Sequence, residues 1–330
     1  MQPLGYQTLR EHMRARSAWK PAEYLIWLIP IAAWFVLPTH LSLLSQIAIM
    51  GLFALSLDLL LGYAGIVSLG HGAFFGLGAY VAGLLGKYGW GEPLSGLAAA
   101  ALVAGAFGYV SSFLVLRGTD LTRLMVTLGI ALMLSEVANK MHWLTGGADG
   151  LQGVAIWPVL GLWRFDLYGR VGYAYAVAVL FVLFLLARRI VHSPFGQSLR
   201  AIKQNERRMH ALGAPVMHRI VAVCTLSAAY AGVAGALLAQ TTQFVSLESI
   251  GFGKSADVLI MLVLGGTGRL YGALLGALAF MAMRHVLSGM TPQYWEFWLG
   301  AMLVLLVMFA RGGIFGLIDV LRARLGWARA

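Results

Sequence analysis

Residues 61–80 read Leu-Gly-Tyr-Ala-Gly-Ile-Val-Ser-Leu-Gly-His-Gly-Ala-Phe-Phe-Gly-Leu-Gly-Ala-Tyr, an apolar stretch that six glycines interrupt. Backbone broken in this way is tolerated at membrane depth only where it is buried in protein or faces a water-filled cavity. Residues 262–276 form a second stretch of this kind, around Gly265-Gly266-Thr267-Gly268. Glycine-interrupted segments in the two halves of a chain point to a transport pathway at an internal repeat. Tight helix packing alone explains the glycines equally well, because small residues recur four apart in both stretches.

The whole chain has the composition of a protein built into a membrane. Of its 330 residues, 60% are hydrophobic and only 11% are charged, whereas soluble domains are near a quarter charged. So few charges do not cover the surface of a globule of this size, which excludes a water-soluble enzyme. At roughly 20 residues per crossing, the apolar residues suffice for at most about ten helical spans.

Ten apolar stretches, each bounded by charged or turn residues, are the candidate spans: 22–38, 41–62, 66–86, 94–116, 121–139, 171–189, 218–240, 253–268, 270–288 and 295–310. We interpret the first as a retained anchor helix, because its end lacks the small-x-small pattern of a signal-peptide cleavage site. The weakest span is 253–268, which is short and broken by glycine. The sequence therefore predicts an all-α polytopic transmembrane helical bundle of about eight to ten spans, with re-entrant or broken glycine-rich segments.

An uneven distribution of lysine and arginine accounts for the formal net charge of +11. Basic residues collect in the cytoplasmic loops of membrane proteins. With a cytoplasmic N-terminus, 18 of the 24 basic residues fall inside, and Lys87, Lys140, Arg164, Arg170, Lys254 and Arg284 fall outside. Binding of nucleic acid is the weaker explanation of this charge. We expect a basic cytoplasmic segment at 1–21, a transmembrane domain at 22–311 with an outer loop at 140–170 and an inner loop at 190–217, and a basic cytoplasmic tail at 312–330.

The inner loop contains the clearest local pattern. Ser193 suits a helix N-cap, Pro194 the first helical position and Gly213 the C-terminal cap, which predicts one helix of about 18 residues over 195–212. One face of that helix would carry the apolar residues Phe195, Leu199, Ile202, Met209 and Leu212, and the opposite face the polar residues Arg200, Lys203, Gln204 and Arg207. Such a helix displays its basic face either to anionic lipid or to a groove in a cytoplasmic partner.

Four motifs follow one another along the chain: Ser68-Leu69-Gly70-His71-Gly72-Ala73-Phe74; Thr145-Gly146-Gly147-Ala148-Asp149-Gly150-Leu151; the loop pattern Ser193-Pro194-x-Gly196, Arg200-Ala201-Ile202-Lys203-x-Asn205-Glu206 and Ala211-Leu212-Gly213; and Leu264-Gly265-Gly266-Thr267-Gly268. In this order they resemble the ABC importer permeases of the branched-chain amino acid (LivH/LivM) type. The chain length, the 31-residue outer loop and the basic leader favour the LivM half. The chain departs from the family pattern at Gln204 and at Arg207-Arg208, where more acidic or small residues are expected.

The resemblance implies an importer in which a second, LivH-like permease completes the path. Two cytoplasmic ABC ATPase subunits would supply energy, and a periplasmic binding protein would deliver the substrate. The loop helix would then be a coupling helix that lies in a groove of an ATPase subunit, through Gly196, Arg200, Ala201, Lys203, Asn205, Glu206, Arg207 and Gly213. The chain itself is expected to be a transporter subunit rather than an enzyme and to bind no cofactor, with ATP and magnesium on the ATPase subunits. The expected location is the bacterial inner membrane, with both termini cytoplasmic.

The substrates that the resemblance implies are branched-chain or related hydrophobic amino acids, moved by alternating access. The same permease family also transports urea, short-chain amides and some aromatic acids, and no residue in the sequence identifies the ligand directly. An ion-coupled secondary transporter is the alternative from another class. It requires paired carboxylates in the middle of spans, whereas Asp58, Asp257 and Glu296 lie near predicted span ends, where solvation or an ion pair explains them.

Polar residues and glycine breaks inside spans are the candidates for a translocation pathway. They are Ser68, His71 and Phe74 at the first glycine stretch, Glu136 in the fifth span, and Gly265, Gly266 and Thr267 at the second stretch. No spacing of histidine, cysteine or carboxylates predicts a metal site, and no serine, histidine and aspartate set predicts a catalytic nucleophile. The nearest match to a phosphate-binding loop, at 253–255, has Glu248 where that motif requires glycine.

Overall fold

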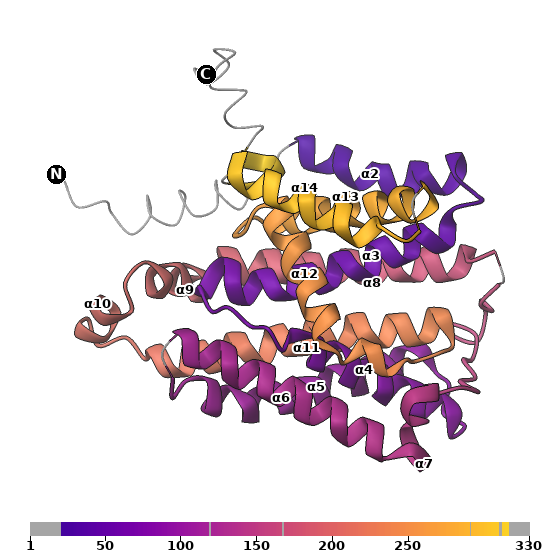
Figure 1. The fold of residues 1–330 in the computed structure, drawn as a ribbon, viewed down its shortest axis with the longest axis horizontal. Helices are drawn as coiled ribbons and strands as arrows, with labels where there is room; N and C mark the ends of the chain where they lie inside the picture. Colours follow the sequence, from indigo (N-terminus) through magenta and orange to yellow (C-terminus); the bar gives the residue numbers. More distant parts are fainter. Residues whose placement is uncertain (1–20, 119, 167, 291, 310–311, 317–330) are drawn as a thin grey trace.

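The computed structural model describes residues 21–309, apart from 119, 167 and 291, together with residues 312–316. The segment expected at 1–21, apart from its last residue, and the tail expected beyond 316 lie outside the described residues. In the part that the structure describes, the chain is helical without strands, and β-pairing is limited to isolated bridges of Leu151 with Val245 and Val159 with Trp163. The predicted all-α fold class is confirmed (Figure 1).

Each of the ten predicted apolar stretches forms a helix. The elements are α2 (Pro21–Val36), α3 (Leu41–Leu57) with a π-helical continuation η1 (Asp58–Ala64), α4 (His71–Lys87), α5 (Pro93–Val115), α6 (Asp120–Lys140), α7 (His142–Thr145), the 3₁₀ turn η2 (Gly147–Asp149), α8 (Arg170–His192), α9 (Pro194–Gln204), α10 (Glu206–Ala211), α11 (Val216–Thr242), the 3₁₀ turn η3 (Leu247–Ser249), α12 (Phe252–Gly265), α13 (Leu270–Met290) and α14 (Trp295–Phe309). The short elements α7, α9 and α10 lie in the two long loops.

Among the described residues, six helices are long and apolar enough to cross a membrane: Leu41–Ala64, Pro93–Val115, Leu121–Lys140, Arg170–His192, Val216–Thr242 and Leu270–Met290. The helix α12 has 14 residues. At 1.5 Å per residue it is roughly 21 Å long, against roughly 30 Å of hydrocarbon in a bilayer. The stretch 253–268, predicted to be the weakest span, is therefore too short to cross by itself.

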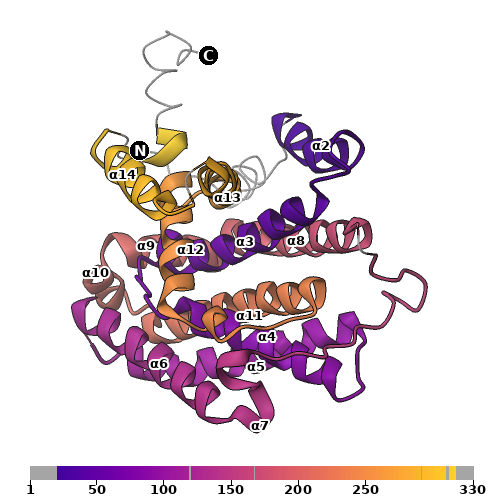
Figure 2. The same ribbon diagram turned by 45° about the vertical axis from the view of Figure 1, so that its right-hand side comes forward.

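The helices lie in layers, and α3 and α11 are at the centre. Figure 2 shows α2, α13 and α14 on one side of the bundle and α5 and α6 on the other, with α12 running between the layers. Most residues of α3 and η1 are buried, whereas few of those in α6 are. The outward face of α6 is thus the kind of apolar surface that suits lipid or a partner helix.

Small residues let the central helices approach closely. The helix α11 packs against α3, α4 and α5, and a Cβ added at Gly78 of α4 would overlap the backbone of Gly232 in α11. Ser227 Oγ of α11 donates to the carbonyl oxygen of Ser56 in α3, at 2.6 Å. Close backbone approach and interhelical hydrogen bonds are the usual means of helix association in a membrane.

The loop between α6 and α8 folds back onto the bundle. It follows Lys140, the last residue of α6, and ends at Arg170, the first residue of α8. The backbones of Leu151 and Val245 exchange two hydrogen bonds, at 2.8 and 3.2 Å, which fasten the loop beside the end of α11. A side chain at Gly83 of α4 would meet Leu151, so the glycine makes room for the loop.

Candidate functional site

The loop after α8 forms two helices where the sequence predicted one. The predicted start is confirmed: Ser193 Oγ accepts a hydrogen bond from the backbone N–H of Gly196 at 3.4 Å, and Pro194 occupies the first turn of α9. The predicted continuous helix over 195–212 is wrong, because Asn205 has extended backbone (φ −159°, ψ 97°) and separates α9 from α10.

Asn205 causes this break through its side chain. Its Oδ1 accepts a hydrogen bond from the backbone N–H of Arg208 at 2.9 Å, which makes Asn205 the N-cap of α10. Asparagine competes with the helix for backbone partners, so it is favourable at caps and unfavourable in helix interiors. Glu206 then stands in the first turn of α10, where a negative charge is favourable.

The end of α10 follows the pattern that Gly213 predicted. Gly213 has left-handed backbone (φ 75°). Its N–H bonds to the carbonyl oxygen of His210 at 3.0 Å, and the N–H of Ala214 to that of Met209 at 3.1 Å. This pair of bonds is the Schellman motif, which satisfies the last carbonyl groups of a helix.

The apolar side of α9 is occupied by the chain itself. Leu199 and Ile202 are buried where α9 packs against α8, η1 and α11. Leu212, predicted on the same face, is instead 71% exposed. The break at Asn205 changes the direction of the chain, and a wheel drawn through one continuous helix therefore misplaces residues beyond it.

Two of the basic residues expected on the displayed face also contact the bundle, although Lys203 stays exposed. Lys203 Nζ donates a hydrogen bond to the carbonyl oxygen of Gly62 at 2.8 Å. The guanidinium of Arg200 lies over the ring of Tyr63, 5.0 Å from its centroid. Both contacts are with η1, whose last carbonyl groups lack a partner further along the helix. Cations are favourable at such a helix end, so α9 is fastened to the first glycine break.

The two glycine breaks meet beside this contact. The first begins at Gly65, whose left-handed backbone (φ 79°) ends η1, and the chain resumes a helix only at His71. The second lies between α12 and α13, with positive φ at Gly266 and Gly268. Asp58 of η1 is fully buried, and its Oδ1 accepts a hydrogen bond from the N–H of Gly268 at 2.7 Å.

Gly62 stands between these partners. A Cβ built on Gly62 would overlap Asp58 and lie 2.6 Å from the backbone nitrogen of Gly268. Only glycine therefore lets η1, the second break and α9 come together at one point. The result is a junction, defined here as Asp58, Gly62, Lys203 and Gly268, which joins three segments that are remote in the sequence.

A second contact ties α10 to the bundle. Arg123 Nη2 in the first turn of α6 lies 3.9 Å from Glu206 Oε2, and the Glu206 side chain is 44% exposed. The Arg123 side chain is 14% exposed, so the pair is partly shielded from solvent. The start of α6, the α9–α10 loop and the α12–α13 turn accordingly lie at the same end of the bundle.

The structure brings three of the predicted pathway residues together. Ser68, His71 and Phe74 line one small cavity of about 20 Å³ between α4, α5, α6 and α11. His71 is fully buried, its Nε2 is 2.8 Å from Ser56 Oγ and its ring stacks on Phe53 at 5.5 Å. This cavity holds about one water molecule, so these residues pack the interior in the state that the structure describes.

The remaining pathway candidates lie elsewhere. Glu136 is on the exposed face of α6, where its Oε1 is 3.5 Å from Lys140 Nζ, and it does not line the cavity of Ser68, His71 and Phe74. Gly265 and Gly266 are buried at the second break, whereas Thr267 is exposed. In the part of the chain that the structure describes, no group of three or more histidine, cysteine or acidic side chains is placed to hold a metal ion.

Asp58 is the residue of the junction that sequence reasoning undervalued. It was assigned to a solvated or ion-paired span end, but it is buried and bonds to a backbone N–H. The signal in the sequence is its position, as the only charged residue in the long apolar run from 41 to 70. For Asp257, the ion-pair assignment agrees with the 3.8 Å separation between Asp257 Oδ2 and Arg284 Nη1.

A layered bundle of apolar helices, with buried glycine breaks and a polar loop fastened to one of them, defines an integral membrane protein. A family model described as "Branched-chain amino acid transport system / permease component" matches residues 39–307, and the chain belongs to this family. The resemblance drawn from its motifs is confirmed.

Individual relatives agree with the family. The chain is 30% identical over 322 residues to the permease protein LivM of Salmonella typhimurium, covering 90% of this chain and 76% of the relative. It is 30% identical over 284 residues to LivM of Escherichia coli, covering 80% and 67%. The permease protein LivH of Escherichia coli is 25% identical over 288 residues, covering 82% and 92%. No solved structure matches the chain.

Proposed function

We propose that this chain is a transmembrane permease subunit of an ATP-binding cassette importer. It carries branched-chain or related hydrophobic amino acids across a bacterial inner membrane by alternating access. A second, LivH-like permease completes the path, two cytoplasmic ATPase subunits bind ATP and magnesium, and a periplasmic binding protein delivers the substrate. The chain itself performs no catalysis and binds no cofactor.

Membership of a permease family supports the transport assignment. Relatives of both the LivM and the LivH kind match most of this chain, which supports two related permeases in one transporter. The higher identity to LivM favours pairing of unlike subunits over pairing of two copies of this chain. An ion-coupled carrier is disfavoured because the buried Asp58 is held by a backbone N–H.

The observation that carries the coupling proposal is the hydrogen bond from Lys203 Nζ to Gly62 at 2.8 Å. A coupling element must contact the ATPase on one side and the moving part of the permease on the other. The outer side of the loop presents the exposed residues Gln204, Arg207 and Arg208. Its inner side is joined to the junction of Asp58, Gly62, Lys203 and Gly268, where glycine breaks give the backbone freedom to change. Displacement of α9 is thereby passed directly to both breaks.

The orientation rests on where the basic residues lie. Arg123, the α9–α10 loop and Arg269 gather at one end of the bundle, through the contacts of Glu206 with Arg123 and of Gly268 with Asp58. Lysine and arginine collect on the cytoplasmic side of membrane proteins. This end is therefore assigned to the cytoplasm, where an ATPase subunit meets it, and both termini are assigned to the same side.

Replacement of Ala201 tests the coupling. Ala201→Pro removes a backbone donor inside α9 and costs about 3 kcal/mol of helix stability, whereas Ala201→Ser leaves the helix intact. Both variants are reconstituted with the partner subunits in proteoliposomes, and assembly is verified by co-purification. We expect Ala201→Pro to abolish uptake and substrate-stimulated ATP hydrolysis while Ala201→Ser retains them. Normal ATP-driven uptake by an assembled Ala201→Pro complex would refute the coupling assignment.

A substrate panel tests the choice of cargo. The complete transporter is supplied with its binding protein and with leucine, isoleucine, valine, urea, a short amide or an aromatic acid in turn. We expect the three branched-chain amino acids to stimulate ATP hydrolysis most strongly. Stimulation by urea but not by leucine would contradict the substrate assignment and leave the permease assignment intact.

A further inference from the structure

A cavity of about 310 Å³ lies at the end of the bundle remote from α9. Its walls come from α3, α4, α11, α12 and α13, which are the central helices together with the short α12. Small-molecule sites in proteins span roughly 300–1,000 Å³, so the cavity has the size of a site for one small ligand. No residue of the four family motifs lines this cavity; Phe75, which does line it, follows directly after the first motif.

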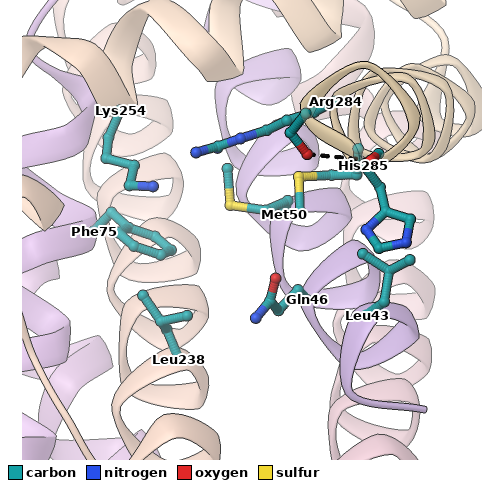
Figure 3. A pocket seen from close by; sticks show the side chains of 10 residues that line it. Leu43, Gln46, Met50, Phe75, Leu238, Lys254, Arg284 and His285 are labelled. Carbon is teal, nitrogen blue, oxygen red and sulfur yellow. Dashed lines mark hydrogen bonds between the residues drawn. The ribbon is translucent and has the colours of Figure 1, made fainter. Parts of the chain in front are cut away.

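Two cationic side chains enter this cavity from different helices. Lys254 belongs to the first turn of α12 and Arg284 to the outer half of α13, and Figure 3 shows both side chains reaching into the space between α3 and the opposite wall. Arg284 Nη1 is held 3.8 Å from Asp257 Oδ2 and its guanidinium lies 4.9 Å from the centroid of the Trp295 ring. Among the described residues, Lys254 Nζ has no hydrogen bond or ion pair, although it lies in the field of Asp257.

The other walls provide hydrocarbon together with three uncharged polar groups, the amide of Gln46, the imidazole of His285 and the hydroxyl of Ser288. Met50, Phe75 and Leu238 face the cavity from α3, α4 and α11, and Gln46 enters it from α3 (Figure 3). A free lysine ammonium and an arginine are donors for a carboxylate. The Gln46 side-chain oxygen is an acceptor for an ammonium group. Apolar walls accommodate an aliphatic side chain, so the cavity offers one partner for each part of a hydrophobic α-amino acid.

We propose that this cavity is a binding site for the transported amino acid inside the permease, in which Lys254 and Arg284 receive the α-carboxylate. The proposal rests on the proposed function and deepens it, because it gives the permease a part in selecting its cargo. Gln46 receives the α-ammonium group, and Met50, Phe75 and Leu238 contact the hydrocarbon side chain. On the assigned orientation the cavity lies in the outer half of the membrane, where a substrate arrives before the cytoplasmic junction opens.

Protection of a cysteine in the cavity wall measures binding separately from transport. The chain contains a single cysteine, Cys224, so Leu43→Cys in a Cys224→Ser background places one reactive thiol beside the cavity. The assembled complex is labelled with a small polar maleimide in the presence of L-leucine, of 3-methylbutylamine, which lacks the carboxylate, or of 4-methylpentanoate, which lacks the amine. We expect L-leucine to protect best, 4-methylpentanoate to protect at higher concentration and 3-methylbutylamine not to protect.

Substitutions of lysine identify the carboxylate partner. Lys254→Gln is expected to raise the half-protecting concentration of L-leucine at least about tenfold, a loss of about 1.4 kcal/mol, and Lys254→Arg is expected to restore most of it. Lys87→Gln is the matched control, because Lys87 is exposed on the same side of the protein and does not line the cavity. Restoration by arginine separates a role in binding from a defect in folding.

Uptake of radiolabelled L-leucine by the unsubstituted complex is measured in parallel. One outcome would overturn the site and leave the proposed function standing. In it, the unsubstituted complex takes up L-leucine, and L-leucine protects the Lys254→Gln and Lys87→Gln variants equally well. Protection by 3-methylbutylamine as strong as that by L-leucine would also overturn it. Protection without any uptake would instead refute the proposed function while retaining the binding site.

Discussion

Lys203 and Gly62 are 141 residues apart in the chain, yet the Nζ of one donates to the carbonyl oxygen of the other across 2.8 Å. Lys203 belongs to the loop helix α9, and Gly62 to the π-helical end of the central span. In the same junction, Asp58 Oδ1 accepts a hydrogen bond at 2.7 Å from the backbone N–H of Gly268, which belongs to the second glycine break. These two contacts connect a surface element to the backbone breaks of both halves of the chain, which is the arrangement that mechanical coupling requires.

Gly62→Ala tests whether close approach holds the junction together. The added methyl group would overlap Asp58 and the backbone of Gly268, and overpacking of this kind costs about 1–3 kcal/mol. We expect a melting temperature several degrees lower for the purified protein in detergent. Gly253→Ala is the control, because a Cβ there meets open space in the first turn of α12. Equal melting temperatures for the two variants would contradict the account.

Asp58 has a positioning role that depends on an acceptor rather than on a charge. Asp58→Asn keeps an oxygen for the N–H of Gly268, whereas Asp58→Leu leaves that donor unsatisfied at a cost of about 1–3 kcal/mol. Thermal unfolding and leucine uptake are measured for both variants. We expect Asp58→Asn to stay near the unsubstituted protein and Asp58→Leu to lose stability and transport. If both variants lose transport equally, the negative charge itself is needed.

Asn205 divides the loop into two helices, and its removal is expected to loosen the second one. Loss of an N-cap costs about 1 kcal/mol, which corresponds to roughly fivefold faster opening. Hydrogen exchange of the α10 amides should accelerate by that factor in Asn205→Ala and stay unchanged in Asn205→Asp. Gln204→Ala, an exposed neighbour, controls for the loss of a side chain. Exchange that Asn205→Ala leaves unchanged would show that tertiary contacts alone hold α10.

Structural features that depend only on neighbouring residues in the sequence were predicted correctly. Ser193 and Pro194 begin α9 and Gly213 ends α10 because caps depend on neighbouring residues. The ten apolar stretches are helices, as predicted, because the hydropathy and the length that predict a span are properties of a single segment. The shortness of 253–268 was likewise visible before its helix was known.

Features that depend on long-range contacts were missed. Glu136 faces outward on α6, and the direction of that face is decided by packing rather than by composition. Lys203 is exposed as expected, but its ammonium group and the half-buried guanidinium of Arg200 also contact η1, and no local pattern contains these contacts. Asp58 was judged by its distance from a span end, whereas its partner Gly268 lies 210 residues away. The break at Asn205 was within reach of local reasoning, because asparagine before glutamate is a helix-start pattern.

The number of leucine molecules moved per ATP hydrolysed, measured in proteoliposomes containing the complete transporter, tests the coupling through α9 most directly. Lys203→Met removes the hydrogen bond to Gly62 and keeps the length of the side chain, Lys203→Arg keeps a donor, and Lys87→Met removes an exposed lysine outside the junction. The account predicts a lower ratio in Lys203→Met than in the unsubstituted complex, because that variant loses a charged hydrogen bond of about 1.5–3 kcal/mol, while the other two variants remain near the unsubstituted complex. An unchanged ratio in an assembled Lys203→Met complex would contradict it.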